Sequence, residues 1–422
     1  MPLKVMPEIK LYIFVRDYLK PITRPLNMKR LLLIVISICM TLPAMSSGQK
    51  EGILNKEHLN VSVHGRYQHM LDWHGIYNDM LNSHESVLMG VQVGLDTHPS
   101  DGSWWANAYN YPSISLGFSY DNAGSMKSRQ GTYLGDFYSL YLATEFDFFR
   151  AGIFSFGPVL ELGMSYSPEK YNPVRNRSNQ FIGSNFLANL AGGLEASLRV
   201  APQWEFALTG YFVHHSNGMT QAPNLGTNQI AAGAKLKYYL APQETAQRVA
   251  LEKPDYPKGL RWNIYTAFGG HSCDWELIAK GPESYPAKFR LRAILGAEAS
   301  YRYNSLASTG IGIEGNYADN AYRETDLLKL GMEDSKGYSP FYTSVHLAQY
   351  FHYADLSVNF TLGIYTFKRT GLVEDISRCF QRIGVRYHLP EFKTGQMFLS
   401  LDMRAHYFDR SYCIEYGTGI TF

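Results

Sequence analysis

The stretch that decides the fold runs from Trp204 to Leu240 and reads WEFALTGYFVHHSNGMTQAPNLGTNQIAAGAKLKYYL. Successive side chains of a β-strand point to opposite faces, so residues two apart share a face. Both ends of the stretch alternate in this way, and its middle is rich in Asn, Gly and Pro. The stretch therefore predicts a β-hairpin whose two amphipathic strands are joined by a polar loop.

Three polar residues lie where the apolar faces of this hairpin reach the loop. The face that begins at Trp204 ends with His214 and Ser216, and Asn228 opens the apolar face of the return strand. A His and a Ser on one strand face are spaced as a general base and a nucleophile need to be. The same residue types are common in ordinary loops, so the spacing alone leaves a structural role open.

The loop motif resembles the signature of the PagL-type lipid A deacylases, or acyloxyacyl hydrolases. The matching residues are His214-His215-Ser216-Asn217-Gly218 and then Pro223-Asn224-Leu225-Gly226-Thr227-Asn228. That family carries His-x-Ser-Asn and Pro-Asn-x-Gly at this spacing, in the last hairpin of a small outer-membrane barrel. Residues 182–186 and the Gly192-Gly193 pair are similar as well. The resemblance covers roughly residues 59–240, and only the hairpin motif is specific.

The resemblance implies that the chain hydrolyses an ester, with the lipid A of lipopolysaccharide as its substrate and no cofactor or metal. Ser216 would attack the acyl carbonyl, and His214 would act as the general base. Asn217 would hold the oxyanion, supported by Gly218 and Asn224. The expected product is lipid A that lacks one acyl chain.

The sequence departs from the family pattern at one residue of the implied site. Members of the family orient the catalytic His with an acidic residue, and that place falls on Asn228 here. An Asn accepts a hydrogen bond from the imidazole N–H and so holds its tautomer, but it brings no charge to stabilise an imidazolium. We therefore expect either a reduced activity or a contribution from another acid.

Composition favours a β-rich protein of more than one domain. The chain has 422 residues, of which 18% are charged and 14% aromatic, with 31 Tyr and 37 Gly. Abundant Tyr and Gly suit many strands bordered by aromatic girdles. A net charge of +2 gives no support to nucleic-acid binding.

The N-terminal region predicts export. Residues 28–48 begin Met-Lys-Arg and continue with an apolar run and small residues, the pattern of a secretory signal peptide. Residues 1–27 do not belong to that pattern, and we interpret them as an over-extended gene start. No later apolar run reaches about eighteen residues, so no transmembrane helix is predicted. Three Cys follow the signal, an odd number that predicts neither a disulfide framework nor a zinc site.

The remaining chain predicts two repeats of about eight antiparallel strands each, residues 59–240 and 260–422, separated by a Pro-rich linker at 241–259. The strands expected in the first repeat are Leu59–Met70, Glu85–Asp96, Pro112–Tyr120, Phe137–Phe149, Ile153–Tyr166, Gly183–Val200, Trp204–Ser216 and Asn228–Leu240. Those of the second are Arg261–Gly270, Lys288–Tyr303, Thr309–Tyr317, Phe341–Tyr353, Leu356–Phe367, Cys379–Leu389, Met397–Phe408 and Tyr412–Phe422. The second repeat is predicted to be degenerate, because Phe408 stands where Ser216 would.

Alternating strands joined by short turns and long loops predict an all-β transmembrane barrel in the outer membrane of a Gram-negative bacterium. The last strand ends in Phe422, which resembles the signal read by the barrel assembly machinery, and alternation places Tyr412 and Tyr416 on its lipid-facing side. Two small tandem barrels are the favoured arrangement, and one ring of about sixteen strands is the alternative.

The favoured function is an outer-membrane esterase that removes an ester-linked acyl chain from lipid A. The alternative is a barrel without catalytic activity, either a pore or a scaffold with a decayed site. A water-filled pore needs about sixteen strands in one ring, whereas about eight strands leave a lumen that side chains fill. The number of strands in each ring therefore bears on the choice of function.

Overall fold

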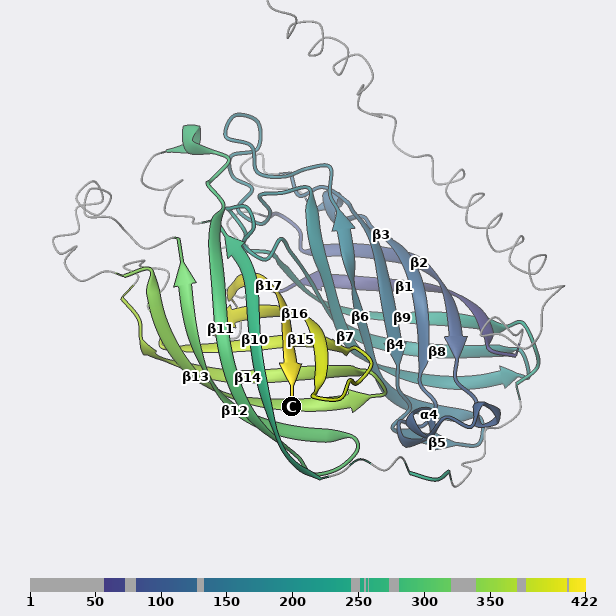
Figure 1. Ribbon diagram of the computed structural model, residues 1–422. Helices are drawn as coiled ribbons and strands as arrows, with labels where there is room; N and C mark the ends of the chain where they lie inside the picture. The colour runs from purple at the N-terminus through teal and green to yellow at the C-terminus, as the bar shows by residue number, and fades with distance from the viewer. Residues whose placement is uncertain are drawn as a thin grey trace, which may run out of the picture. The chain divides into compact units, whose positions relative to one another are not determined.

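The computed structural model describes residues 57–72, 81–126, 133–243, 251–253, 256, 258–272, 281–319, 339–369, 377–407 and 410–422. These residues form two closed antiparallel β-barrels of eight strands each, the first purple to teal and the second green to yellow in Figure 1. The predicted signal peptide, the segment before it and Cys273 lie outside the described residues, as does most of the predicted linker.

The first barrel is a ring in which every strand pairs with its neighbours along the chain, and β1 closes on β9. A three-residue strand, β5 (Phe149–Ala151), extends the ladder at the start of β6. The ring strands are β1 (Leu59–Met70), β2 (Glu85–Asp96), β3 (Ser113–Asp121), β4 (Phe137–Glu145), β6 (Phe154–Tyr166), β7 (Phe186–Ala201), β8 (Trp204–Ser216) and β9 (Thr227–Tyr239).

The second barrel is built in the same way and closes between its first and last strands. Its strands are β10 (Gly259–His271), β11 (Arg290–Arg302), β12 (Ala307–Ala318), β13 (Phe341–Tyr353), β14 (Leu356–Phe367), β15 (Cys379–His388), β16 (Gln396–His406) and β17 (Arg410–Thr421). The prediction of two tandem barrels is confirmed, and the alternative of one sixteen-stranded ring is wrong, because each set of eight strands closes on itself.

Among the residues that the structure describes, helix is confined to four short segments, which are η1 (Pro99–Asp101), α4 (Trp104–Ala108), η2 (Ala123–Ser125) and η3 (Pro282–Ser284). Within the described part of the chain, none of the helices has the length and apolar character needed to cross a membrane.

The alternation of side chains follows from the two environments of a barrel wall. In β8 the residues Phe206, Leu208 and Phe212 are exposed, and the residues of the opposite face, from Glu205 to Val213, are buried. Apolar side chains on the outside of a barrel meet lipid, while the small lumen of eight strands is filled by the other face. Both barrels therefore present an apolar outer surface around a packed polar interior.

Ion pairs share the lumens with buried aromatic and small apolar side chains. In the first barrel, Arg66 pairs with Glu161 and stacks 3.7 Å from the ring centre of Tyr211. In the second, Arg404 Nη2 lies 2.9 Å from a carboxylate oxygen of Glu314. A buried charge is tolerated only when it is paired and hydrogen-bonded, so these contacts specify how the wall strands face each other.

Two expectations about strands are corrected by the structure. The strand predicted over Phe137–Phe149 ends at Glu145, because Phe146 donates to the carbonyl of Pro158 and Pro158 has no N–H to return. Tyr412 was expected on the lipid face but is buried in the lumen, where its ring centre lies 4.4 Å from Cζ of Arg292. The register shifts there: Arg404 pairs with Cys413 and Ala405 with Ser411, which leaves Tyr412 as the extra residue of a bulge.

One end of the first barrel is closed by its long loops. Buried Ala123 and Met126 from the β3–β4 loop and Phe181 and Ile182 from the β6–β7 loop form one apolar cluster there. Leu225, from the β8–β9 loop, packs against this cluster. The loop that carries the predicted site is therefore supported from behind by a small hydrophobic core.

Candidate active site

His214 and Asn228 form a directly opposed cross-strand pair on the outer face of β8 and β9. His214 Nδ1 lies 2.7 Å from Asn228 Oδ1. Because an amide oxygen only accepts, Nδ1 carries the proton in this pair, which leaves the lone pair of Nε2 for another donor. The contact thus selects the imidazole tautomer that a general base needs.

Ser216 is the last residue of β8 and shares the outer face with His214. Its side chain is buried, with the residue 1% exposed, and its Oγ has no hydrogen-bond partner among the described residues. A buried hydroxyl without a partner is costly, so such a group in a hydrolase-like motif is held ready for another interaction.

Gly226 shows how close the imidazole and the serine lie. A Cβ on this residue would stand 3.1 Å from His214 Cε1 and 3.3 Å from Ser216 Cβ, so both side chains border one point. The residue has φ of +70°, a left-handed conformation that favours glycine. Glycine is therefore needed at this position both for the backbone turn and for the room that the two side chains occupy.

The residues expected to hold the oxyanion are arranged by the loop between β8 and β9. The backbone N–H of Asn217 donates to Asn224 Oδ1 at 2.9 Å, and its side-chain Nδ2 donates to the carbonyl of Gln221 at 2.6 Å. Gly218 turns the chain with φ of +61°. Asn224 therefore supports the loop. The second N–H of Asn217 Nδ2 is not used in these two hydrogen bonds.

The β6–β7 loop fixes the site loop from the side. The N–H of Gly226 donates to the carbonyl of Phe181 at 2.9 Å, and that of Leu225 to the carbonyl of Gln180 at 3.1 Å. A Cβ on Gly183 would lie 2.6 Å from the carbonyl oxygen of Gln221, so only glycine allows this approach. The sequence motif contained Gly183 and Gly226, but their supporting roles were not predicted from it.

His215 faces the lumen behind the site. Its Nδ1 lies 3.2 Å from Thr227 Oγ1, and its ring stacks on Phe137 with 4.4 Å between centres. The two contacts join β8, β9 and β4 directly behind the pair of His214 and Asn228. The inner face of the hairpin therefore fixes the register on which the outer pair depends.

An apolar outer surface borders the site. On the neighbouring strand β7, Leu190 pairs with His214, and the small Ala188 pairs with Ser216. Phe186, two residues from Ala188 on the same face, is 63% exposed. Polar groups are costly beside lipid, so their place at the end of β8, next to the long loops, suits the membrane interface.

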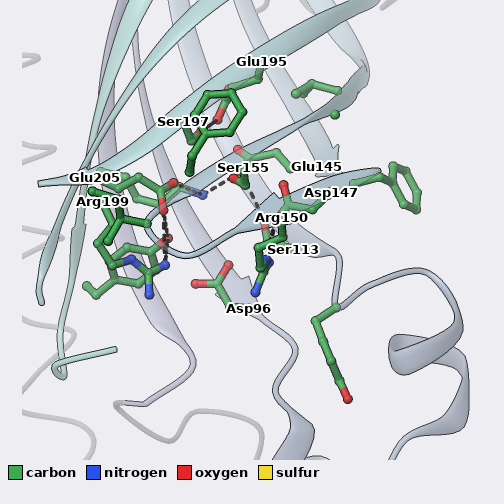
Figure 2. Close-up of a pocket in the computed structure, with 18 of the residues that line it drawn as sticks. Asp96, Ser113, Glu145, Asp147, Arg150, Ser155, Glu195, Ser197, Arg199 and Glu205 are labelled. Atoms are coloured by element: carbon green, nitrogen blue, oxygen red, sulfur yellow. Dashed lines mark hydrogen bonds and ion pairs between the residues drawn. The ribbon is translucent and has the colours of Figure 1, made fainter. Parts of the chain in front are cut away.

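A polar cavity lies at the other end of the first barrel and includes none of these residues (Figure 2). Glu205, near the start of β8, lines it, whereas Ser216 ends the same strand. The predicted site is thus a feature of the outer wall and is separate from the lumen.

Comparisons with known proteins bear on both barrels. No curated protein matches the chain. Solved structures that resemble it include OccK11 (OpdR) of Pseudomonas aeruginosa, 12% identical over 86% of this chain and 95% of that one, with a TM-score of 0.22. The β domain of the Bordetella autotransporter BrkA is 11% identical over 86% and 98%, with a TM-score of 0.21. Scores this low carry no argument about fold or function.

The family models are informative for both halves of the chain. Residues 89–237, which include His214, Ser216 and Asn228, match the model described as lipid A 3-O-deacylase (PagL). Residues 260–422 match the model described as acyloxyacyl hydrolase, C-terminal domain. The second barrel therefore corresponds to a described domain of such hydrolases, and the two matches together span most of both barrels. The chain belongs to the PagL family of lipid A deacylases and acyloxyacyl hydrolases.

Proposed function

We propose that this protein is an outer-membrane esterase that removes one ester-linked acyl chain from lipid A, with Ser216 as nucleophile and His214 as general base. The observation that carries the proposal is the hydrogen bond from His214 Nδ1 to Asn228 Oδ1, which leaves Nε2 free on the face that Ser216 shares. A nucleophile, a base and an orienting group in this order form the hydrolase arrangement that recurs on unrelated folds.

In the first half of the reaction, Ser216 Oγ gives its proton to His214 Nε2 and attacks the acyl carbonyl carbon. The carbonyl oxygen becomes an oxyanion, and we assign its stabilisation to the second N–H of Asn217 Nδ2 and to the N–H of Gly218. The ester C–O bond then breaks, and the departing alkoxide takes the proton from the imidazolium. The products of this half are the lipid alcohol and an acyl group on Ser216.

In the second half, water repeats the same steps. His214 takes a proton from the water, whose oxygen attacks the acyl-serine carbonyl. Collapse of the second oxyanion releases a fatty acid and returns the proton to Ser216 Oγ. One ester bond and one water are consumed, and no cofactor enters the balance.

Asn228 supports this chemistry by orientation and not by charge. Its Oδ1 holds the imidazole in the correct tautomer in both halves of the reaction. A carboxylate in the same place would in addition stabilise the imidazolium that forms after proton transfer. The proposed enzyme is therefore slower than a version with an acid at this position.

The substrate reaches the site from the membrane. The outer faces of β7 and β8 are apolar beside the site, with exposed Phe186 and Phe212, so an acyl chain can lie along them. The carbonyl of that chain then meets Ser216 at the end of the strand. This arrangement supports a lipid substrate better than one dissolved in water.

A scaffold with a decayed site is the second candidate, and the observation that favours it is the missing acid at Asn228. A pore loses its main support, because each ring has eight strands and its lumen is filled by ion pairs. The activity test therefore decides between an esterase and a scaffold.

The experiment is mass spectrometry of lipid A from cells that express the wild type, Ser216→Ala or His214→Ala. Loss of one acyl chain is expected with the wild type alone, because loss of a nucleophile or base lowers such rates by several orders of magnitude. The matched control is Ser184→Ala, which removes a rim hydroxyl that donates to the carbonyl of Phe186 at 2.7 Å. Equal acylation with all variants, each shown to be folded by heat-modifiable migration, would establish the scaffold.

A further inference from the structure

The site loop between β8 and β9, which carries the proposed oxyanion donors, is contacted by residues of the second barrel. Both barrels belong to one compact unit, residues 57–422. The last two residues of the site loop donate to the β6–β7 loop, within the first barrel. In its first half, the backbone of Met219 and of Ala222 is bound by Ser272, the residue that follows β10. The second barrel therefore reaches the part of the loop that comes after the proposed nucleophile.

Ser272 bridges two backbone groups of the site loop with one buried side chain. Its N–H donates to the carbonyl of Met219 at 2.6 Å, and its Oγ donates to the same oxygen at 3.2 Å. The N–H of Ala222 donates to Ser272 Oγ. A hydroxyl both donates and accepts, so this one group joins the two ends of the segment 219–222. Ser272 is 0% exposed, and hydrogen bonds that are shielded from water are stronger.

The backbone conformation of the loop explains why it needs such support. Gly218 and Met219 follow one another, each with φ of +61°. Glycine adopts this left-handed region freely, whereas a side chain makes it unfavourable. An unfavourable conformation persists where the surrounding contacts hold it. The two bonds from Ser272 end on the carbonyl of Met219, so they stabilise the residue whose conformation is unfavourable.

Ile414 of β17 packs against Gly218. A Cβ on Gly218 would stand 2.8 Å from Ile414 Cγ1 and 2.9 Å from its Cδ1, so only glycine leaves room for this side chain. Ile414 lies on the outer face of the second barrel and is partly buried, whereas Tyr416, two residues further on the same face, is exposed. The N–H of Gly218 is one of the two donors assigned to the oxyanion. Ile414 therefore covers the backbone that carries this donor.

A further contact reaches the neighbouring loop of the site. The hydroxyl of Tyr285, from the β10–β11 loop, donates to the carbonyl of Gly183 at 2.7 Å. The ring of Tyr285 also meets Tyr171 edge-on, with 5.0 Å between centres. Gly183 in turn lies against the carbonyl of Gln221, so the β6–β7 loop and the site loop are held together. The second barrel thus contacts both loops that shape the site.

We propose that the second barrel is a positioning domain for the site loop, in which Ser272 and Ile414 set the place of the oxyanion donors at Asn217 and Gly218. The inference rests on the proposed function, because it assigns a role in the same ester hydrolysis. Donors stabilise an oxyanion best when they are fixed before the charge develops. Both donors lie beyond the end of β8, outside the sheet ladder, so their place depends on what the loop packs against.

The test measures release of fatty acid from lipid A in mixed micelles by purified full-length variants. Ser272→Ala removes the hydroxyl that joins the two ends of the segment 219–222, and kcat should fall about 3- to 10-fold, the effect of one lost hydrogen bond. KM should stay within about twofold, because the acyl chain is assigned to the outer faces of β7 and β8. Ile414→Ala should change kcat in the same way, and Ile414→Val, which keeps Cγ1, should restore most of the rate.

Hydrogen exchange supplies a readout that does not depend on activity. Peptides that cover residues 217–226, followed by mass spectrometry, should exchange faster in Ser272→Ala and in Ile414→Ala than in the wild type. The reason is that a segment opens more readily when it loses a contact that holds it. Heat-modifiable migration shows first that each variant is folded. Should Ile414→Ala fail to fold, Ser272→Ala and Ile414→Val give the same comparison.

Two matched controls change the same residue types elsewhere in the second barrel. Ser339→Ala removes a hydroxyl that accepts from the N–H of Phe341 at 3.0 Å, in the β12–β13 loop. Ile364→Ala shortens an exposed side chain on the outer face of β14. Both controls should match the wild type in kcat and in the exchange of the site loop.

The possible results separate this proposal from the proposed function. An active wild type, with unchanged kcat and unchanged exchange in Ser272→Ala and Ile414→Ala, would overturn the proposal and leave the esterase in place. A higher KM with unchanged kcat would also overturn it, because the contacts would then serve substrate binding. A wild type without deacylase activity would refute the proposed function itself; faster exchange in the two variants would then still show that the second barrel holds the loop.

Discussion

The replacement of Asn228 by Asp tests how the proposed site works, because it changes charge while it keeps shape. The side chains of Asn and Asp have the same length, so the carboxylate oxygen takes the place of Oδ1 at 2.7 Å from His214 Nδ1. The imidazole keeps its tautomer and gains a negative neighbour. We expect Asn228→Asp to increase kcat for deacylation.

The size of the increase follows from the change in one hydrogen bond. A neutral hydrogen bond contributes about 0.5–1.5 kcal/mol, and one to a charged group contributes about 1.5–3 kcal/mol. The difference of roughly 1–1.5 kcal/mol applies to the imidazolium formed in the transition state, and it corresponds to a rate increase of about 5- to 10-fold.

Asn228→Ala gives the opposite result. Without Asn228 Oδ1, this contact no longer holds the proton on His214 Nδ1. Part of the protein population then carries the imidazole proton on Nε2, which cannot act as a base in that form. Loss of the bond costs about 1–3 kcal/mol, and kcat should fall by roughly 5- to 150-fold. KM should change little, because Asn228 is not expected to touch the acyl chain.

The assay follows release of fatty acid from lipid A in mixed micelles, with purified and folded variants over a range of pH. A carboxylate beside the imidazole favours its protonated form. The acidic limb of the kcat/KM profile should therefore move to higher pH in Asn228→Asp. Equal rates for the wild type, Asn228→Asp and Asn228→Ala would refute the assigned role, because neither charge nor orientation at this position would then matter.

Further predictions concern the loop and the lumen. Gly226→Ala should lower activity by at least about tenfold with the barrel intact. The left-handed φ of +70° costs other residues about 1–2 kcal/mol, and the added Cβ would meet the side chains of both His214 and Ser216. Lipid A mass spectrometry measures the activity, and heat-modifiable migration controls for folding. Gly183→Ala should also reduce activity, because its Cβ would displace the carbonyl of Gln221, and a wild-type rate would show that the loop yields. Glu161→Gln should destabilise the barrel by about 3–5 kcal/mol, because it leaves Arg66 buried without its charge partner; the unfolding midpoint in urea reports the loss. Planar bilayers should show no stable open channel, and a sustained ohmic current would contradict the filled lumens.

Strict alternation explains why much of the fold could be predicted from the sequence. The bounds of β1, β2, β8, β13 and β14 agree with the prediction to the residue, because each changes abruptly from alternating to turn residues. Periodicity fails where the ladder itself is irregular. The bulge that turns Tyr412 inward adds one residue to β17 without changing its composition, so no pattern in the chain marks it.

The local part of the candidate site could be predicted from the sequence for the same reason. His214 and Ser216 share a face by parity alone, and a hairpin brings Asn228 opposite His214 once its loop length is fixed. Contacts between distant strands carry no such signal. Arg66 and Glu161 are 95 residues apart, and the carboxylates around the lumen cavity come from separate strands, so only the closed ring shows which charges are paired.

The closed ring also explains why the proposed chemistry belongs on the outside of the barrel. With eight strands, the lumen has no room for a lipid once side chains fill it, so a residue that meets an acyl chain must face outward. Polar groups there are costly beside hydrocarbon, which restricts them to the end of a strand. Ser216 ends β8, and His214 stands one outward position before it, so the base is placed as deep as the interface permits. The inner face at the same level is then free to stiffen the wall, which His215 does through Thr227 and Phe137. One short hairpin thus supplies the reacting groups on its lipid side and their support on its lumen side.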